Sequence, residues 1–176
     1  MVGGTPATDD HLYFLRIALA EAAKAIPKPG AFCVGCVLML PSPDGERFAV
    51  LSTGFSRELT GNTHAEANAL DKAAVLSSAE LRDLCPWLDQ DSTLESVMPS
   101  LAVYTTMEPC STRTSGMAAC ADALIATGVR ACYIGVAEPD DFVVCEGAQK
   151  LRAAGIEVQY VRGLEKECLE IARRAT

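Results

Sequence analysis

A histidine and an acid at the start of one predicted helix are the first residues that could do chemistry. His64 and Glu66 stand in the string GNTHAEANAL, and the chain has only two histidines. A helix start offers unpaired N–H groups and the positive end of the helix dipole, so a metal-bound oxyanion would be stabilised there. The other histidine, His11, lies in the first predicted helix beside an acidic cap, where a solvated or helix-packing role is the better explanation.

Two cysteines complete a set of metal ligands. Cys110 follows Pro109 at the end of a predicted strand in the string TTMEPC, and Cys120 lies ten residues later, in or near the next helix. With His64 they supply three zinc ligands and leave the fourth tetrahedral position for water, as a catalytic zinc requires. Zinc lowers the pKa of that water from about 15.7 to roughly 7. Glu66 can then take the proton and deliver it to a ring nitrogen and to leaving ammonia.

Each half of this signature has a structural alternative. Thr63-x-x-Glu66 fits a capping box, in which the acid bonds back to the residue that caps the helix. Taken without the cysteines, that explanation is as good as the catalytic one. The general zinc-deaminase pattern is Pro-Cys-x-x-Cys, whereas nine residues, STRTSGMAA, separate the cysteines here. Cys120 could therefore be a core residue on an alanine-rich helix.

Cys33 and Cys36 form a second possible zinc pair. The spacing Cys33-Val-Gly-Cys36 occurs in structural sites, and Cys110 and Cys120 could complete a four-cysteine site. The pair, however, lies in a strand pattern, AFCVGCVLML, where positions three apart point to opposite faces. Core packing is therefore the favoured explanation for these two cysteines.

The elements that must position these residues follow from hydrophobic periodicity and turn residues. Apolar positions recur at helical spacing over 9–26, and the string PKPG ends that helix. Short apolar runs bounded by glycine and proline predict strands. Residues 80–100 are expected to form an inserted loop with a little helix. The other predicted elements are strands at 31–40, 48–56, 101–107, 131–137 and 156–161, and helices at 63–78, 118–127, 146–154 and 164–174.

The order of these elements indicates an α/β fold with a mixed sheet. From residue 101 onward strand and helix alternate, which requires parallel strand pairing with helices on both faces. The first two strands form a hairpin through the turn PSPDGE. The length of 176 residues suits one domain, so we treat 1–176 as a single unit in which residues 1–8 are flexible.

Composition excludes several classes of protein. Hydrophobic residues make up 49% of the chain and charged residues 22%, which suits a folded core and not a disordered chain. The net charge of −8 would repel a nucleic-acid backbone, because binding to phosphates relies on clustered basic residues. A small anionic substrate remains compatible, since one or two local basic residues suffice for a single phosphate.

The location expected for this chain is cytoplasmic. No apolar run reaches the roughly 18–20 residues of a membrane span, and the start, MVGGTPATDD, has neither region of a signal peptide. Eight cysteines in a reducing compartment are explained as small core residues and metal ligands.

These motifs resemble the cytidine-deaminase-like superfamily, and most closely the pyrimidine deaminases of riboflavin biosynthesis. The bacterial enzymes carry PNPxVGCV, HAExxAL, an EPCS motif with a long inter-cysteine loop, ALIxxGV and LRxAGIEV. The corresponding strings here are PKPGAFCVGCVLML, HAEANAL, TTMEPCSTRTSGMAAC, ALIATGV and LRAAGIEV. The resemblance extends from about residue 12 to 162. It implies one zinc per chain, held by His64, Cys110 and Cys120, with Glu66 as the catalytic acid–base.

Two departures from the bacterial pattern favour the fungal branch, namely the inter-cysteine loop and the reductase domain of the bacterial enzymes, which has no counterpart in this sequence. The inter-cysteine loop is one residue longer and lacks GRTPP, and instead carries Arg113-Thr114-Ser115-Gly116. Glu138-Pro139 followed by Phe142 is also similar to the fungal form. The resemblance implies a stand-alone deaminase that converts 2,5-diamino-6-ribitylamino-4(3H)-pyrimidinone 5′-phosphate, or its ribosyl form, to the 2,4-dione with loss of ammonia. It further implies a three-layer α/β/α sandwich with a five-stranded mixed sheet, and a homodimer without nucleic-acid or membrane partners.

Four residues are candidates for substrate contacts. Arg113, beside the metal, suits the phosphate, although a solvated loop arginine is an equal alternative. Asn62 could bond to the pyrimidine edge or serve a turn after Gly61. Asn68 lies one helical turn beyond His64 and would face the same way, or else serve packing or capping. Cys33, with its neighbour Phe32, is a candidate for an apolar wall.

Two other functions compete with this one. A deaminase of cytidine, deoxycytidylate, guanine or tRNA adenosine would share the metal chemistry, but the acidic charge disfavours tRNA and the cysteine spacing disfavours the nucleoside and nucleotide enzymes. A non-catalytic zinc-stabilised interaction domain would have four protein ligands and no need of Glu66.

Overall fold

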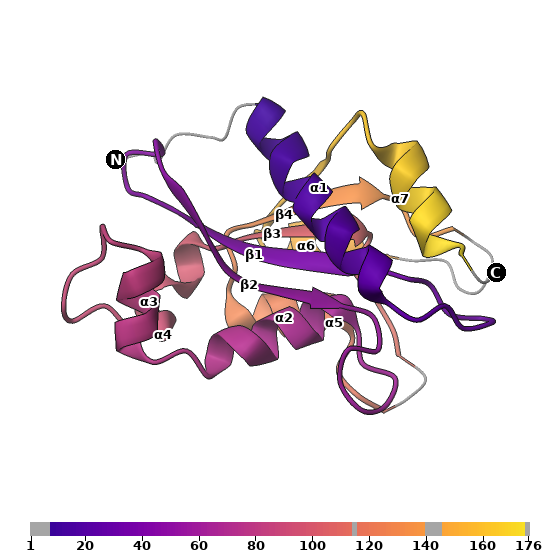
Figure 1. Cartoon of the computed structure of the whole chain (residues 1–176), viewed down its shortest axis with the longest axis horizontal. Coiled ribbons are helices and arrows are strands. Elements are labelled where there is room, and N and C mark those ends of the chain that lie inside the picture. Colours follow the sequence, from indigo (N-terminus) through magenta and orange to yellow (C-terminus); the bar gives the residue numbers. More distant parts are fainter. Residues whose placement is uncertain (1–7, 114–115, 140–145, 175–176) are drawn as a thin grey trace.

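A five-stranded mixed sheet forms the middle layer of the protein (Figure 1). The computed structural model describes residues 8–113, 116–139 and 146–174. The strand order is β2-β1-β3-β4-β5, with β1 antiparallel to both neighbours and β3, β4 and β5 parallel. The predicted hairpin and the parallel C-terminal half are confirmed. The strands are β1 (Gly35–Pro41), β2 (Phe48–Phe55), β3 (Ala102–Met107), β4 (Ala131–Val136) and β5 (Glu157–Tyr160).

Helices cover both faces of the sheet (Figure 1). On one face, α1 (Thr8–Lys24) and α7 (Glu165–Ala172) pack against an apolar cluster that includes Val37 and Tyr104. On the other face, α2 (Ala65–Ala74), α5 (Cys120–Thr127) and α6 (Gly147–Ala153) bury small and branched side chains against the sheet. The predicted three-layer α/β/α sandwich is confirmed.

Two predicted boundaries were wrong. The strand expected over 31–40 begins only at Gly35, so the residues before it form a loop. The helix expected over 63–78 ends at Ala74, and a new helix, α3 (Ser78–Leu84), follows. The division has a local cause, because Ser77 and Glu80 form a capping box that starts α3 and interrupts the preceding helix.

The segment at 80–100 is more ordered than predicted. It contains the end of α3, α4 (Leu94–Val97) and the 3-10 helix η1 (Met98–Ser100). Leu81 and Val97 are buried in the same core as α2 and α5. The segment is therefore part of the fold and not a loose insertion, because its apolar residues complete the core beside β2.

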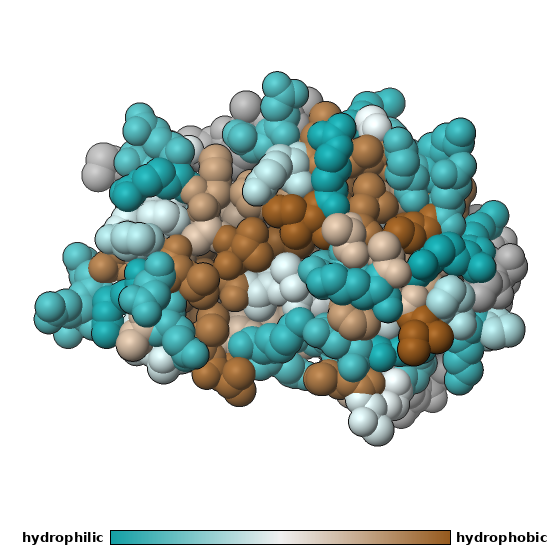
Figure 2. Space-filling view, viewed as in Figure 1, coloured by the Kyte–Doolittle hydropathy of each residue, from teal (hydrophilic) through white to brown (hydrophobic). Residues whose placement is uncertain are grey.

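The edge strand β2 leaves apolar side chains partly uncovered. Phe48 and Val50 are half-buried members of the cluster under α1. Figure 2 shows an apolar band that crosses this face of the molecule between α1 and α2.

The described part of the chain includes no helix with the length and apolarity needed to cross a membrane. Of the predicted flexible segment 1–8, residues 1–7 lie outside the described residues, and the single-domain assignment stays a prediction.

Candidate active site

The candidate site lies at one end of the sheet, where β3 ends and two helices begin. β3 ends at Met107, and Cys110 follows three residues later. α2 begins directly after His64, which is its N-cap, and α5 begins at Cys120. Helix starts present unpaired N–H groups and positive partial charge, so this end of the molecule suits thiolates and anionic oxygen atoms.

The metal helix α2 approaches the sheet closely because Gly54 has no side chain. A Cβ at this position would lie 2.2 Å from Ala65 O and 2.7 Å from Ala69 N. Any larger residue would displace α2 from β2. The glycine therefore sets the height of His64 above the sheet.

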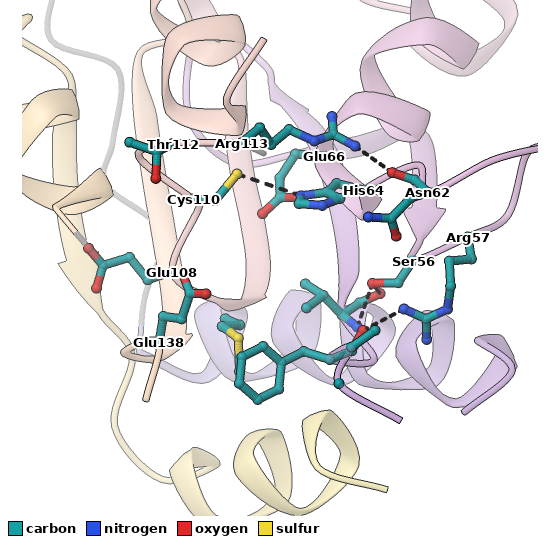
Figure 3. Close-up of a pocket in the computed structure, with 15 residues that line it drawn as sticks. Ser56, Arg57, Asn62, His64, Glu66, Glu108, Cys110, Thr112, Arg113 and Glu138 are labelled. Atoms are coloured by element: carbon teal, nitrogen blue, oxygen red, sulfur yellow. Dashed lines mark hydrogen bonds between the residues drawn. The ribbon is translucent and has the colours of Figure 1, made fainter. Parts of the chain in front are cut away.

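The three predicted metal ligands are brought together. His64 Nδ1 lies 3.6 Å from Cys110 Sγ (Figure 3). It lies 3.4 Å from Cys120 Sγ. All three ligand atoms lie within 4.8 Å of one another. A tetrahedral zinc with Zn–N of about 2.0–2.1 Å and Zn–S of about 2.3 Å separates such N and S atoms by about 3.5 Å. The residues therefore fit zinc in both donor chemistry and spacing.

Cys110 is the thiol best prepared to bind metal. Its sulfur accepts the backbone N–H of Cys120 at 3.3 Å, and its carbonyl accepts the N–H of Ala121 at 3.1 Å, so Cys110 satisfies the first two N–H groups of α5. Hydrogen bonding to the Cys120 side chain, and then to His64, lowers the pKa of the Cys110 thiol well below its usual value. The thiolate is the form that binds metal.

Glu66 is buried next to these ligands without joining them. Its exposed fraction is 3%, and its carboxyl faces the same pocket as His64 and Cys110 (Figure 3). Burial raises the pKa of the Glu66 carboxyl, while the nearby His64 acts in the opposite direction. A raised carboxyl pKa brings the group toward the range in which an acid–base catalyst works at neutral pH.

Thr105 gives Glu66 a partner that suits either protonation state. The Thr105 hydroxyl lies 3.1 Å from Glu66 Oε1 and 2.9 Å from Met107 O. A hydroxyl has one hydrogen and two acceptor positions. It can therefore donate to the Glu66 carboxylate, or donate to Met107 O and accept from the protonated acid. The capping-box explanation of Glu66 was wrong, because His64 is the N-cap and Thr63 bonds to Leu59 instead.

Asn62 and Arg113 both line the pocket. The Arg113 guanidinium donates from Nη2 to Asn62 O at 2.5 Å, and the two residues lie on the same side of the His64 ring (Figure 3). Arg113 Nε is buried and has no hydrogen-bond partner within the described parts of the chain. A buried donor without a partner is costly, so this nitrogen is suited to an acceptor supplied by a ligand.

Asn68 and Cys33 are placed differently from expectation. Asn68 is fully buried, and its Nδ2 donates to Phe55 O at 2.8 Å and to Thr63 Oγ1 at 3.1 Å. It therefore ties the end of β2 to the residue before His64 instead of facing the pocket. Cys33 is fully buried behind the pocket wall, whereas its neighbour Phe32 lines the pocket. The placement of Cys33 follows from the loop that replaces the first half of the predicted strand, whereas that of Asn68 follows from its bonds to Phe55 and Thr63.

The other cysteine alternatives are also resolved. Cys36 is fully buried on β1, and the metal-competent group within the described residues contains neither Cys33 nor Cys36. Core packing of this pair is confirmed. Cys120 is nearly buried but directs its sulfur toward His64, so it is not simply a core residue. His11 packs against Tyr104 under α1, as a helix-packing histidine.

A buried acid, Glu108, lies in the loop that carries Cys110 and was not predicted from the sequence. Glu108 accepts hydrogen bonds from the N–H of Ala148 at 2.8 Å and from the hydroxyl of Tyr160 at 2.7 Å. It therefore anchors the loop that carries Cys110 to α6 and β5. Glu108 and Glu138 lie on the far side of the pocket from Asn62 (Figure 3). The EPC motif contained Glu108, but its partners are about 40 and 52 positions away, so only the fold could reveal them.

A second missed residue is Arg57, which also lines the pocket. In the sequence, Arg57 is recognisable only as a charged residue in the loop between β2 and α2, and it belongs to no motif that would indicate a functional role. Of the fungal-type features, Thr114, Ser115 and Phe142 lie outside the described residues.

Comparison with known proteins assigns the family. The model of the cytidine and deoxycytidylate deaminase zinc-binding region matches residues 8–136. The chain belongs to this family. The matched region contains the ligand triad and Glu66, and the prediction of a zinc-binding deaminase domain is confirmed.

Relatives within this deaminase family support the finer resemblance. The chain is 35% identical over 165 residues to the diaminohydroxyphosphoribosylamino-pyrimidine deaminase of Schizosaccharomyces pombe, covering 94% of this chain and 35% of that protein. It is 29% identical over 153 residues to a riboflavin biosynthesis protein of Chlamydia trachomatis, covering 86% and 33%. The chain thus spans about a third of the length of these relatives.

Solved structures give the same result. The Aspergillus oryzae Rib2 deaminase, a C-terminal deletion mutant, superposes with a TM-score of 0.71 at 37% identity, covering 92% of this chain and 90% of the other. The same deaminase in complex with DARIPP superposes with a TM-score of 0.70 at 36% identity, covering 92% and 89%. A cyanophage dCMP deaminase shares the fold, with a TM-score of 0.54 at 18% identity, covering 88% and 99%. The fold is that of the cytidine deaminase-like proteins.

Proposed function

We propose that this chain is a zinc-dependent hydrolytic deaminase of riboflavin biosynthesis. Its substrate is 2,5-diamino-6-ribitylamino-4(3H)-pyrimidinone 5′-phosphate, or the ribosyl form, and its products are the 2,4-dione and ammonia. The single observation that carries the proposal is the group of three ligand residues next to a non-ligating buried acid, with His64, Cys110 and Glu66 lining one pocket. The relatives named for this activity support the choice of substrate.

His64, Cys110 and Cys120 would hold the zinc. When bound, the ion supplies a Lewis acid that activates water at neutral pH. Three protein ligands suit this role, because a structural zinc site uses four. Within the described residues the ligand group has three members, which argues against the non-catalytic interaction domain.

Glu66 would move the protons. Its carboxylate accepts a proton from the attacking water and donates it to a ring nitrogen of the pyrimidine. A second proton from the same water then passes through Glu66 to the leaving amine, which departs as ammonia. Thr105 keeps the carboxyl oriented in both states, as its hydroxyl can donate or accept.

Charge would orient the substrate in the pocket. Arg113 contributes a buried Nε donor suited to the phosphate, and Asn62 lies beside it for the pyrimidine edge. Glu108 and Glu138 lie opposite and would repel the phosphate from that side. The phosphate is therefore expected at the Arg113 side, and the amino-substituted ring above Glu66.

Ammonia release by the zinc-loaded protein tests this proposal. The panel contains the ribitylamino-pyrimidine phosphate, its ribosyl form, cytidine and deoxycytidylate, with zinc stoichiometry measured on the same preparation. We expect one zinc per chain and ammonia from a diaminopyrimidine phosphate. Turnover of cytidine or deoxycytidylate with none of the pyrimidine phosphates would overturn the assignment, and zinc binding without any turnover would favour the interaction domain.

A homodimer and a cytoplasmic location are part of the same proposal. The edge position of β2 and the apolar band in Figure 2 support a dimer, because an uncovered strand edge is a ready pairing surface. The seven described cysteines are all free, which supports a reducing compartment. Light scattering and cell fractionation test the two statements; a monomer or an extracellular product would contradict them.

A further inference from the structure

Arg57 adopts a backbone conformation that disfavours its own side chain. Within the described ranges it is the only non-glycine residue with a positive φ, at 63°. This left-handed conformation is unfavourable for an L-residue, because its Cβ crowds the following carbonyl oxygen. Such a cost persists only where the surrounding contacts hold the residue in place. The contacts of Arg57 therefore identify what the conformation achieves.

The guanidinium group of Arg57 clamps the loop formed by residues 26–33. Nε and Nη2 donate to Ile26 O at 3.3 and 2.9 Å, and Nη1 donates to Phe32 O at 2.9 Å. Nη2 also lies 3.3 Å from Cys33 Sγ. One planar group thus joins the two ends of the 26–33 loop, which the rigid fork of arginine allows and a lysine ammonium does not.

The backbone of Arg57 connects this clamp to the metal site. Its N–H donates to Thr63 O at 2.7 Å, and Thr63 immediately precedes the ligand His64. The adjacent Ser56 exchanges hydrogen bonds with Val34, whose N–H donates to Ser56 Oγ at 2.9 Å. The 26–33 loop and the loop that leads to His64 are therefore joined at two neighbouring positions.

The 26–33 loop forms one wall of the pocket. Within the described residues, a backbone bridge joins Lys28 to Ala31, and Cys33 N–H donates to Ala172 O. Gly30, Ala31 and Phe32 all line the pocket. The position of this wall relative to the metal ligands therefore depends on Arg57.

The donors of Arg57 are largely occupied. Of the five N–H groups of a guanidinium, four are used by Ile26, Phe32 and Cys33. The group is therefore poorly placed to grip a phosphate with two parallel hydrogen bonds. Arg113, with its unpartnered Nε, is better placed for that role.

We propose that Arg57 is a positioning residue for substrate binding, which holds the wall of the 26–33 loop at a set distance from the metal ligands. The proposal rests on the deaminase function stated above. A preformed wall spares the substrate the cost of ordering the loop, so its loss weakens binding more than chemistry.

Arg57→Gly and Arg57→Lys test the clamp, with Arg47→Lys as the matched control. Glycine adopts the positive φ without strain, so that variant removes only the side chain. Arg47 is exposed and lies over the Trp87 ring, away from the pocket. We expect Arg57→Gly to raise KM at least about tenfold, with kcat within about threefold and zinc stoichiometry unchanged. Arg57→Lys should also raise KM, millimolar guanidinium ion should lower the KM of Arg57→Gly, and Arg47→Lys should match the parent.

A substrate without its phosphate separates the clamp from a phosphate contact. If Arg57 acts through the wall, the rise in KM persists with the dephosphorylated substrate. A rise that disappears with that substrate would identify Arg57 as a phosphate ligand and overturn the proposal. Equal losses of kcat, zinc and thermal midpoint would show a general stabilising role and would also overturn it.

Amide hydrogen exchange tests the clamp without any substrate. In Arg57→Gly the backbone amides of Ala31 and Cys33 should exchange at least about tenfold faster than in the parent, because the loop opens more often. Unchanged exchange would refute the clamp. Absence of ammonia release by the parent protein would count against the proposed function alone, since this exchange measurement stands apart from turnover.

Discussion

Two buried titratable side chains, Glu66 and His11, show how the same physical effect serves different ends. Burial raises the pKa of the Glu66 carboxyl and lowers the pKa of the His11 imidazole, because it disfavours the charged form of each. Glu66 opens onto the pocket beside the metal ligands, whereas His11, a residue of α1, is buried against Tyr104 and Tyr133 on the other face of the sheet. Access to the pocket, and not the shift itself, distinguishes the catalytic candidate.

Replacing Glu66 by glutamine should remove the proton carrier and leave the metal site in place. The amide has the same size and can still bond to Thr105, but it cannot accept a proton. We expect a loss of at least about 10²-fold in turnover with one zinc per chain retained. Glu95→Gln, an exposed acid on α4, serves as the matched control. Turnover of Glu66→Gln within a few-fold of the parent would remove Glu66 from the mechanism.

His11 should make folding stability sensitive to mild acid. Its ring is hydrogen-bonded to the Tyr104 hydroxyl at 3.0 Å, and its centroid lies 4.2 Å from that of the Tyr133 ring. Burial lowers the pKa of the imidazole, whereas the negative charges of Asp10 and Glu157 act to raise it. Because the folded pKa lies below 6.5, the unfolded chain binds the proton first. The stabilising contribution is therefore complete above pH 6.5 and is lost as pH falls through the folded pKa.

Urea unfolding at pH 7.5 and 5.5 checks this sign. The parent should lose more stability than His11→Gln between the two values, because glutamine keeps a polar partner for Tyr104 but does not titrate. The same loss in both proteins would place the acid sensitivity elsewhere.

Among the secondary-structure elements, α2 and α5 create the site because both begin there. His64 is the N-cap of α2, and Ala119 is the N-cap of α5, whose first N–H, that of Cys120, donates to the Cys110 sulfur. Neither cap is a side chain of the usual Ser, Thr, Asp or Asn type, since the Cys110 sulfur receives the N–H and the His64 ring faces the cysteines. Metal-ligand residues therefore lie at both helix starts, where ordinary capping side chains are absent.

Gly54→Ala should displace α2 and weaken zinc binding. The added Cβ would meet the backbone of the metal helix at 2.2 Å, so the helix must shift. We expect a loss of stability of about 1–3 kcal/mol or more, together with at least a tenfold lower zinc affinity in chelator competition. Gly35→Ala is the control, because its Cβ would meet Ala18 of α1 at 1.9 Å on the opposite face. Equal zinc affinities in the two variants would contradict this account.

The whole molecule brings the ligands together from distant parts of the chain. Cys110 and Cys120 lie 46 and 56 positions from His64. β1 lies between β2 and β3 and is antiparallel to both, so β2 and β3 run in the same direction. Their C-terminal ends therefore lie at the same end of the sheet, where the pocket forms. α6 and β5 lie beyond residues 8–136, which the family model matches. They support this end of the sheet because Ala148 and Tyr160 donate hydrogen bonds to Glu108.

Removal of zinc should therefore lower the stability of the protein, because the ion would join α2, α5 and the loop that carries Cys110. With free zinc at 100 times its Kd, binding adds about 2.7 kcal/mol to stability, or roughly 5–10 °C in Tm for a chain of this size. We expect a chelator to lower Tm by this amount and to stop ammonia release, both restored by zinc. The variant His64→Ala should show a much smaller shift. An unchanged Tm in the parent after verified metal removal would contradict the joining role.

The sequence by itself determined the ligand types, the non-ligating acid and the alternation of elements. These are local signals, because a helix start, an EPC string and an apolar period are each contained in a short stretch of chain. The element boundaries were less secure where two local preferences competed. At Ser77 a capping box divided an alanine-rich helix, and before Gly35 an apolar run stayed a loop because Arg57 bonds its carbonyls from a distant position.

Only the tertiary structure decided which polar residues face the pocket. Asn68 has the helical spacing of a substrate contact, yet its amide is used by Phe55 and Thr63. Arg57 carries no motif, yet its left-handed backbone turns the side chain onto the pocket wall. Contacts between segments tens of residues apart set these directions, and the spacing of residues within one segment cannot reveal them.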